Sequence, residues 1–307
     1  MNQFNLNNKK KILVTGASGF LGNELIKQLL NEGDFHVIAM TSKVNELKEK
    51  YTNNYITVVS SQTWKSKLKE DSMHVDILIN CAFPRSSDPE VLALGIPFTE
   101  QLIKDSIDFG IKNIINISSQ SVYTQKDKED VTEQSNVQPE SLYGMSKFAC
   151  ERVVTILSEE ANINFSNIRL GSLTGINFDV RMTNRFVKSA IAGEKIIITG
   201  GQQKISYLDV RDAAKGLIKM LYKDPIGWNN IYNLGSKEHF TLIELVETIK
   251  EEAKEHSLHN IVVEVQDGDS NFNNVMNNNL FYEHFSFQPY YNFKKMINEL
   301  FTYQLEK

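Results

Sequence analysis

The most constraining feature of this sequence is a set of three glycines at intervals of three residues, in the stretch ILVTGASGFLG. An apolar, strand-like run precedes the first glycine, and a helix-like apolar pattern follows the last. In such a strand–turn–helix the first glycine permits a tight turn, the second lets the backbone approach a pyrophosphate, and the third allows close helix–strand packing. The helix start attracts phosphate through its N–H groups and its dipole. The stretch predicts a dinucleotide-binding turn formed by Gly16, Ser18, Gly19, Phe20, Leu21 and Gly22.

Up to about residue 158, short apolar runs alternate with segments of helical apolar spacing. Strands are expected at 11–16, 35–40, 55–60, 76–83 and 111–119. Strands that alternate with helices indicate a parallel sheet covered on both faces, and its crossovers must be right-handed. The sequence therefore predicts an α/β fold with a Rossmann-type doubly wound parallel sheet.

The alternation becomes looser after residue 158. We expect strands at 163–170, 195–200 and 260–266, and helices at 183–193, 209–223 and 241–256. The asparagine-rich segment 270–285 is interpreted as a surface connection. These patterns predict a dinucleotide-binding domain at 10–170, which also receives segments from about 205–240. A smaller C-terminal α/β substrate lobe is expected at 171–204 and 241–307.

Composition excludes several other classes of protein. The 307 residues carry a net charge of −5 with no basic block, which argues against nucleic acid as a partner. No apolar run reaches the roughly 18 to 20 residues of a membrane span, so no membrane partner is expected. Two cysteines far apart in sequence and a polar N-terminus favour the cytoplasm. The histidines lack metal-ligand spacing, so no metal site is expected.

The end of the second expected strand bears on the choice of cofactor. An acidic residue there would bind the adenosine ribose hydroxyls of NAD(H). The sequence instead places Thr41, Ser42 and Lys43 at this point. Two hydroxyls beside a cation suit a 2′-phosphate, so NADP(H) is favoured and NAD(H) is the alternative.

A second constellation provides chemistry. Tyr143 and Lys147 are spaced i, i+4 and so share one face of an expected helix. A phenol of pKa ~10 is a poor acid–base group at neutral pH, and a cation one turn away stabilises its phenolate. Ser119 follows the fifth expected strand, at the sheet edge where ligands of open α/β sheets bind. Its hydroxyl is expected to hydrogen-bond a substrate oxygen near that phenol.

Together, TGASGFLG, YGMSK, DILINCA and the stretch RFVKSAIAGEKIIITGGQQKISYLDVRDAAKGLI resemble the extended short-chain dehydrogenase/reductases, specifically the NAD-dependent epimerase/dehydratase branch that acts on nucleotide sugars. The resemblance implies that Tyr143 is the acid–base and that Lys147 binds the nicotinamide ribose. It also implies that Ser119, rather than Ser118, holds the reacting oxygen. By the same resemblance Ala82 contacts the cofactor, Tyr123 lines the substrate pocket, and the chain forms a homodimer.

Departures from the family pattern refine this expectation. The 4,6-dehydratases of this branch place an Asp-Glu pair directly after the catalytic Ser/Thr, where this sequence has Gln120 and Ser121. Dehydration is therefore not expected. The usual substrate-binding asparagine is replaced by Ser172. The usual arginine is replaced by Ile205, so Lys204 or Arg181 is the candidate to supply the missing charge.

The residues and the resemblance together predict an NAD(P)-dependent nucleotide-sugar epimerase or 4-ketoreductase that transfers hydride at a sugar ring carbon, C4, with a Ser119–Tyr143–Lys147 triad, and polysaccharide biosynthesis as its setting. Two alternatives stay open. One is a reductase of a non-sugar ketone, and the other is a dinucleotide-binding sensor without catalytic activity.

Overall fold

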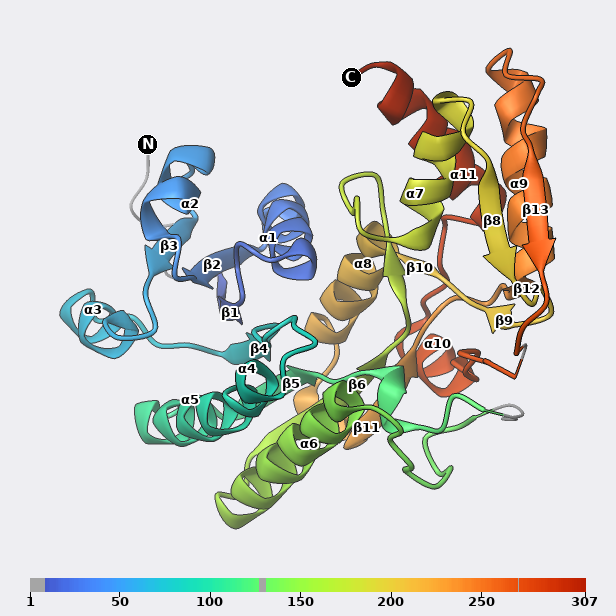
Figure 1. The fold of residues 1–307 in the computed structure, drawn as a ribbon. Helices are drawn as coiled ribbons and strands as arrows, with labels where there is room; N and C mark the ends of the chain where they lie inside the picture. The colour runs from blue at the N-terminus through green and yellow to red at the C-terminus, as the bar shows by residue number, and fades with distance from the viewer. Residues whose placement is uncertain (1–8, 127–130, 270) are drawn as a thin grey trace. The chain divides into compact units, whose positions relative to one another are not determined.

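Seven strands form one sheet in the order β11-β6-β5-β4-β1-β2-β3 in the computed structural model, which describes residues 9–126, 131–269 and 271–307 (Figure 1). The strands are β1 (Lys10–Thr15), β2 (Phe35–Met40), β3 (Ile56–Val59), β4 (Ile77–Asn80), β5 (Asn113–Ile117), β6 (Asn164–Leu170) and β11 (Ile231–Leu234). The pairs β1–β2, β1–β4, β2–β3, β4–β5 and β5–β6 are parallel. The chain places β2 and β3 on one side of β1, then returns to place β4, β5 and β6 on the other side. This strand order confirms the predicted Rossmann-type doubly wound sheet.

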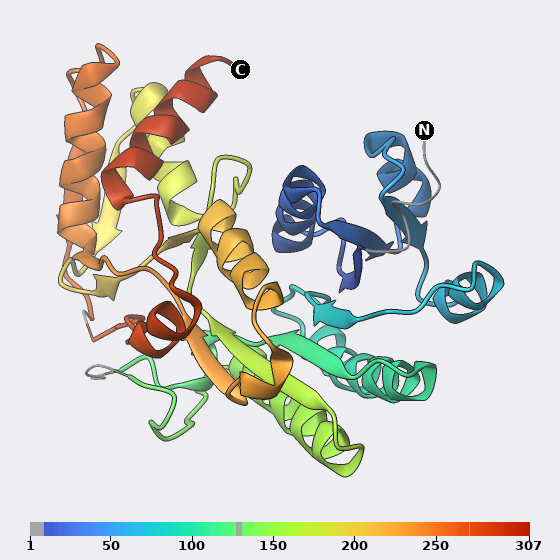
Figure 2. The ribbon, with the colours of Figure 1, turned by 180° about the vertical axis from the view of Figure 1, so that it is seen from behind.

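The helices that connect these strands cover both faces of the sheet. They are α1 (Phe20–Glu32), α2 (Val44–Lys50), α3 (Trp64–Glu70), α4 (Pro89–Ala93), α5 (Gly95–Phe109) and α6 (Leu142–Glu160), together with α8 (Val210–Leu221) and the short 3-10 helices η2 (Gln120–Val122) and η3 (Pro225–Gly227). Figures 1 and 2 show α5 and α6 side by side on one face and α1 on the other. Because both faces are covered, strands such as β2 are buried at every residue.

Contacts between residues divide the chain into two compact units. The first comprises the described residues up to Val122, with 139–169 and 214–232, and holds most of the seven-stranded sheet. The second comprises the described residues of 123–138, with 170–213 and 233–307. The two units are defined by residue contacts alone. The division into a dinucleotide-binding domain and a substrate lobe, expected from the sequence, stays a prediction.

A ladder of buried side-chain hydrogen bonds crosses four strands of the sheet. Thr15 on β1 donates to the Asn80 side chain on β4 at 2.7 Å. Asn80 donates to Asn116 on β5 at 3.0 Å, and Asn116 donates to Asn167 on β6 at 2.8 Å. The four residues are backbone partners in the sheet register, and each is at most 3 % exposed. A shift of one residue in any strand would leave buried amides without partners, so the ladder, which we call the asparagine ladder, favours this register.

A buried ion pair attaches α6 to the sheet. The Glu151 carboxylate on α6 accepts two hydrogen bonds from the Arg169 guanidinium of β6, at 3.1 and 2.9 Å. The same carboxylate accepts a hydrogen bond from Ser118 at the end of β5. Since the side chains of the pair are only 2–3 % exposed, each charge depends on its partner to offset the loss of water.

The second unit has its own core. It contains α7 (Met182–Ile191), α9 (Leu242–Glu255), α10 (Asn279–Phe285) and α11 (Phe293–Leu305), with the strands β7 (Leu173–Thr174), β8 (Ile196–Thr199), β9 (Lys204–Ile205), β10 (Leu208–Asp209), β12 (Phe240–Thr241) and β13 (Val263–Gln266). The helices α7, α9 and α11 contact one another, and β8 pairs with β13 in parallel (Figures 1 and 2). Both helices and strands are present, as the prediction of a smaller α/β lobe required.

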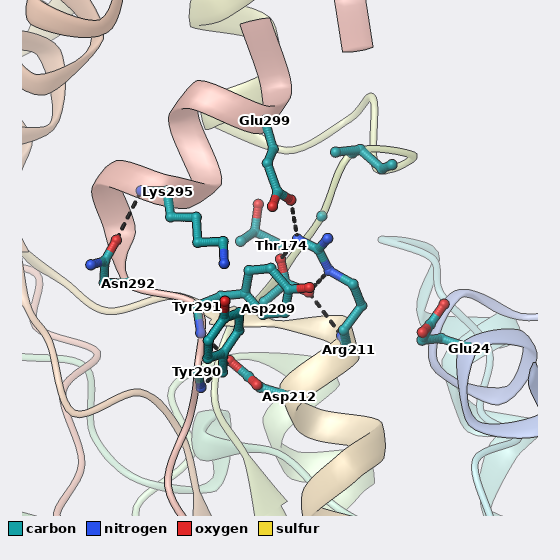
Figure 3. Close-up of polar contacts among 12 residues, drawn as sticks. Glu24, Thr174, Asp209, Arg211, Asp212, Tyr290, Tyr291, Asn292, Lys295 and Glu299 are labelled. Carbon is teal, nitrogen blue, oxygen red and sulfur yellow. Dashed lines mark hydrogen bonds and ion pairs between the residues drawn. The ribbon is translucent and has the colours of Figure 1, made fainter. Parts of the chain in front are cut away.

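A charged cluster joins β10 and α11 within this unit (Figure 3). The Arg211 guanidinium pairs with Asp209 at 2.7 Å and with Glu299 of α11 at 2.6 Å, and it lies 3.6 Å from the centre of the Tyr291 ring. The Asp212 carboxylate accepts the backbone N–H groups of Tyr290 and Tyr291. Burial raises the pKa of Asp212, and the two N–H groups oppose that shift.

The interpretation of 270–285 as a surface connection was wrong over most of its length. Residue 270 lies outside the described residues, but the rest includes α10, whose Phe281 and Phe285 are buried. Asn274 and Asn278 are also buried and hold neighbouring backbone through their side-chain amides. Asparagine can satisfy both a donor and an acceptor of a buried loop, so its abundance here reflects internal hydrogen bonding.

Replacement of Asn116 by Ala is expected to lower the free energy of unfolding by about 2–4 kcal/mol, because it leaves buried groups of Asn80 and Asn167 without a partner. Urea unfolding measures the change. Asn45→Ala, at an exposed position of α2, is the control and should change stability by less than about 0.5 kcal/mol. Equal unfolding midpoints for the two variants would show that the asparagine ladder contributes little.

Candidate active site

The glycine turn has a backbone that only glycine tolerates at two positions. Gly16 has φ +63°, and a Cβ there would lie 2.9 Å from the backbone nitrogen of Ala82. A Cβ on Gly22 would lie 2.3 Å from the Gly16 carbonyl oxygen. At Gly19 the only close neighbour of an added Cβ is that same oxygen, at 3.0 Å, and α1 starts here without a side-chain cap. The turn is therefore a shallow backbone cradle at a helix start, which fits a dinucleotide phosphate.

The other residues expected around this turn are placed as follows. Ser18 lies in the turn, Phe20 is the first residue of α1, and Leu21 is a buried residue of the same helix. Ala82 follows β4, and its N–H donates to the Thr15 hydroxyl at 3.2 Å. The loops after β1 and β4 thus meet at the glycine turn.

Of the three candidate residues after β2, one is buried and two are exposed. Thr41 is buried, and its hydroxyl donates to Ser18 at 2.9 Å while accepting the Lys43 N–H. Ser42 and Lys43 are exposed, and the Lys43 ammonium lies 3.0 Å from the Glu46 carboxylate. The cation expected to bind a 2′-phosphate is therefore accessible, but it has an acidic neighbour.

Tyr143 and Lys147 lie one turn apart on α6, in the first unit, which also contains the glycine turn. The helix starts at a true N-cap, where the Ser141 hydroxyl accepts the Gly144 N–H at 3.1 Å. Tyr143 is half-buried, whereas Lys147 is buried and its ammonium donates to the Ile117 carbonyl oxygen at the end of β5. The contact ties Lys147 to the strand that leads to Ser119.

Ser119 and Tyr143 come from elements that are in close contact. Ser119 is buried directly before η2, and its hydroxyl accepts the Ser121 N–H at 3.1 Å. A Cβ on Gly144 would lie 2.1 Å from the Ser121 carbonyl oxygen, so only glycine lets the first turn of α6 approach this loop so closely. Ser118, the lesser candidate, uses its hydroxyl on Glu151.

Burial sets the charge of Lys147. The loss of water lowers its pKa to about 8, while the nearby Glu151 carboxylate opposes the shift. Cys81 and Cys150 stay neutral thiols near pH 7, since burial raises the pKa of both, that of Cys81 to about 12. The lysine therefore loses its proton within the pH range in which enzymes are assayed.

Tyr123 is 1 % exposed, and its hydroxyl donates to Asn233 at 2.9 Å. This gives Tyr123 a structural contact within the second unit, and its role in lining the substrate pocket stays a prediction.

A cavity of about 410 Å³ opens in the second unit. Its lining residues are Ser172, Val180, Arg181, Met182, Arg185, Gln203, Ile205, Tyr207, Leu242, Phe272 and Asn274. The Arg181 guanidinium lies 5.4 Å from the centre of the Tyr207 ring. Burial raises the pKa of Tyr207, and the positive charges of Arg181 and Arg185 partly offset this rise. Two cations and an aromatic ring in one cavity suit an anionic ligand with a planar ring.

The two substitutions noted in the sequence, Ser172 and Ile205, both line this cavity, whereas the candidate Lys204 does not. Ser172 accepts a hydrogen bond from the Asn274 amide at 3.2 Å, so an asparagine from a distant segment lies next to the serine. Ile205 lines the cavity in place of a cation. Lys204 is not among the lining residues and is exposed, because neighbours in a strand point to opposite faces.

Comparison with known proteins shows the family. The model of the NAD dependent epimerase/dehydratase family matches residues 12–235. The chain belongs to this family. The matched range contains the glycine turn, Ser119, Tyr143, Lys147 and both cavity arginines, whereas Asn274 lies beyond it.

Individual relatives of the family are distant. The "Uncharacterized UDP-glucose epimerase YtcB" of Bacillus subtilis is 25 % identical over 259 residues, which cover 78 % of this chain and 81 % of that protein. The human dTDP-D-glucose 4,6-dehydratase is 24 % identical over 285 residues, covering 85 % of this chain and 80 % of that protein. The crystal structure of UDP-N-acetylglucosamine 4-epimerase from Bacillus cereus is 25 % identical in sequence, with a TM-score of 0.82. The match covers 96 % of this chain and 99 % of that one.

Sequence reasoning missed several residues of these sites. Arg185 lies on the helix expected at 183–193, four residues after Arg181, which lies just before that helix, so its proximity to Arg181 could have identified it. Gly144 directly follows Tyr143, but the close approach to Ser121 needs the structure. No sequence signal identified Phe83 or Asn274. Among the described residues no group of three or more His, Cys, Asp or Glu could hold a metal ion, and none of the described helices has the length and apolarity to span a membrane.

The pH dependence of turnover should report the charge of Lys147. As pH rises through about 8, the ammonium loses its proton and the rate is expected to fall, because the neutral amine no longer stabilises a neighbouring phenolate. In Lys147→Arg the guanidinium keeps its charge, so the rate should stay level to higher pH relative to its own plateau. Initial rates between pH 6 and 10 measure both profiles. If the rate falls over the same alkaline pH range in the native protein and in Lys147→Arg, the loss of the Lys147 proton is not the cause.

Proposed function

We propose that this protein is a nucleotide-sugar oxidoreductase that exchanges hydride at a ring carbon, C4, of the sugar. The observation that carries the proposal is the meeting of three groups: Ser119 after β5, and Tyr143 and Lys147 on the turn of α6 that Gly144 brings against the Ser119 loop. A sensor has no use for a buried lysine beside a tyrosine, so this arrangement favours catalysis over binding alone.

Each side chain has a role that its position supports. Tyr143 takes the proton of the sugar hydroxyl as the ring carbon is oxidised and returns it on reduction. Lys147 favours the phenolate while its ammonium is charged. Ser119 donates its hydroxyl hydrogen to the same sugar oxygen and so polarises it. The Ser121 N–H already donates to the Ser119 oxygen, which leaves the hydroxyl hydrogen to face the sugar.

The dinucleotide fits the first unit. The backbone cradle at Gly16, Gly19 and Gly22 would hold its pyrophosphate, and Lys147 would bind its nicotinamide ribose. When bound, the nicotinamide accepts and gives the hydride. The protein supplies position and charge for that exchange.

The cavity of the second unit would hold the nucleotide part of the substrate. Arg181 and Arg185 supply the positive charge for a diphosphate, and Tyr207 offers a ring face. Ser172, held by Asn274, would hydrogen-bond the nucleotide in place of the family's asparagine. Arg181 thus takes the charge that Ile205 lacks, and the exposed Lys204 is left out of this proposal.

Epimerisation at C4 is the reaction we favour, since the relatives from B. subtilis and B. cereus are named as epimerases. The 4-ketoreductase is the second candidate, and the exposed Ser42 and Lys43 support it by suiting NADP(H). Dehydration is disfavoured, because Gln120 and Ser121 provide neither the acid nor the base that elimination of water needs.

Exposed apolar side chains on α6 and directly before α5 support a homodimer. Leu142, Met145 and Ile156 of α6 are about half exposed, and Leu94 precedes α5 with 65 % exposure. Because α5 and α6 lie side by side, two copies could bury these side chains in one bundle. Light scattering would give the mass of a dimer.

Tyr143→Phe is expected to lower kcat at least about 1,000-fold with any active nucleotide hexose or 4-keto derivative, because it removes the proton carrier. Dissociation constants for NADH and NADPH, measured by fluorescence, should change less than about 3-fold, because the glycine turn is intact. Phe281→Leu, at a buried position of α10 in the second unit, controls for general damage. Turnover by the Tyr143 variant at the native rate would refute the mechanism.

Lys43→Ala is expected to raise KM for NADPH by about 10-fold and leave KM for NADH within about 2-fold, since only NADPH carries the 2′-phosphate. Glu46→Gln should act in the opposite direction, because it removes the carboxylate 3.0 Å from that ammonium. Initial rates with each cofactor provide the comparison. Equal changes for NADPH and NADH would indicate that Lys43 does not select the cofactor.

A further inference from the structure

Phe83, one residue after Ala82, contacts both residues of the Tyr143–Lys147 pair. The centre of its ring lies 5.7 Å from that of Tyr143 in an edge-on arrangement of 78°. The Lys147 ammonium nitrogen lies 4.4 Å from the centre of the same ring. One aromatic side chain from the loop after β4 therefore connects the proposed acid–base to its cation.

Gly95 at the start of α5 makes room for this ring. A Cβ on Gly95 would lie 2.4 Å from Cε2 of Phe83 and 2.9 Å from two further ring carbons. The Gly95 carbonyl oxygen accepts hydrogen bonds from Thr99 and Cys150, so the backbone that faces the ring is itself fixed. The position of the Phe83 ring is thus defined by packing from α5 and from α6.

The other groups around the Lys147 ammonium give it little electrostatic support. On α6, Glu151 is already paired with Arg169, and Cys150 is a neutral thiol near pH 7. After β4, Cys81 is likewise a neutral thiol. From β5 the Ile117 carbonyl oxygen accepts one hydrogen bond. The negative face of an aromatic ring attracts a cation most strongly when water is excluded, so the Phe83 ring is a substantial partner for this buried ammonium.

We propose that Phe83 is a positioning residue that holds the Lys147 ammonium in its charged form beside Tyr143, and so helps Tyr143 to act as a base. The inference rests on the proposed function for its catalytic meaning. The contact itself belongs to the folded protein and is measurable without a substrate. Phe83 acts through Lys147 and touches no reacting atom in this account.

Graded fluorination of Phe83 tests this proposal with almost no change in shape. Incorporation of 4-fluoro-, 3,5-difluoro- and pentafluorophenylalanine at position 83 progressively removes the negative charge of the ring face. The ionisation of Tyr143 is then read as the ultraviolet difference spectrum against Tyr143→Phe carrying the same residue at position 83. We expect the pKa of Tyr143 to rise stepwise with fluorine content, because Lys147 is charged less of the time. Turnover should fall in parallel, by about 3- to 30-fold for the pentafluoro ring.

Two controls separate this effect from general perturbation. Fluorination of Phe98 on α5, for which no cation contact is found among the described residues, should leave the Tyr143 titration unchanged. In a Lys147→Met background the series at position 83 should also have no effect. The Phe83→Tyr variant keeps an aromatic face and should retain most activity, whereas Phe83→Leu should behave like the pentafluoro ring.

The outcomes are distinct. A Tyr143 titration that does not respond to fluorination overturns the proposal, and so does a response that persists in Lys147→Met. A stepwise shift in a protein that turns over no nucleotide sugar would support the Phe83–Lys147 contact and reject the proposed function instead. A shift in both the titration and the turnover supports both.

Discussion

The asparagine ladder is the interaction on which the arrangement of the first unit depends. Thr15, Asn80, Asn116 and Asn167 form hydrogen bonds across four strands only when those strands keep their present register. The ladder lies near the carboxyl ends of the strands, where the chain leaves the sheet. Gly16 follows Thr15 directly, and Ala82 and Ser119 follow within two or three residues of their ladder positions. The register of buried amides thus sets where along the sheet edge the glycine turn and the Ser119 loop leave their strands.

The helix α6 is attached to this edge at two points. Near its middle, the buried pair of Glu151 and Arg169, with Ser118 as a third member, holds the helix to β5 and β6. At its start, Gly144 lets the helix touch the Ser121 backbone. Removing one member of the pair would leave an uncompensated buried charge, at a cost of about 3–5 kcal/mol. Tyr143 directly precedes the attachment at Gly144 and Lys147 lies between the two, so both are placed by contacts that take no part in the proposed reaction.

The sequence was sufficient for the features that are local. The glycine spacing, the alternation of strands and helices, and the i, i+4 pair of Tyr143 and Lys147 each depend on residues close together in the chain, and they led to the correct fold and family. The failures concern contacts between distant segments. Asn274 reaches Ser172 across more than a hundred residues, and Phe83, in the loop after β4, meets Lys147 on α6. Asparagines in 271–285 were misread because composition does not reveal whether an amide faces water or a buried backbone.

The central claim is that hydride moves at C4 of a nucleotide sugar under the control of Ser119, Tyr143 and Lys147. The most direct measurement is to incubate the protein and its dinucleotide with nucleotide hexoses deuterated at C4, and to locate the deuterium by NMR and mass spectrometry. The account predicts deuterium at C4 of the inverted sugar if the protein is an epimerase, or on the nicotinamide ring if it is a ketoreductase acting in reverse. Deuterium at C6 would indicate a 4,6-dehydratase, and deuterium that stays at C4 of unchanged sugar across the panel would contradict the account.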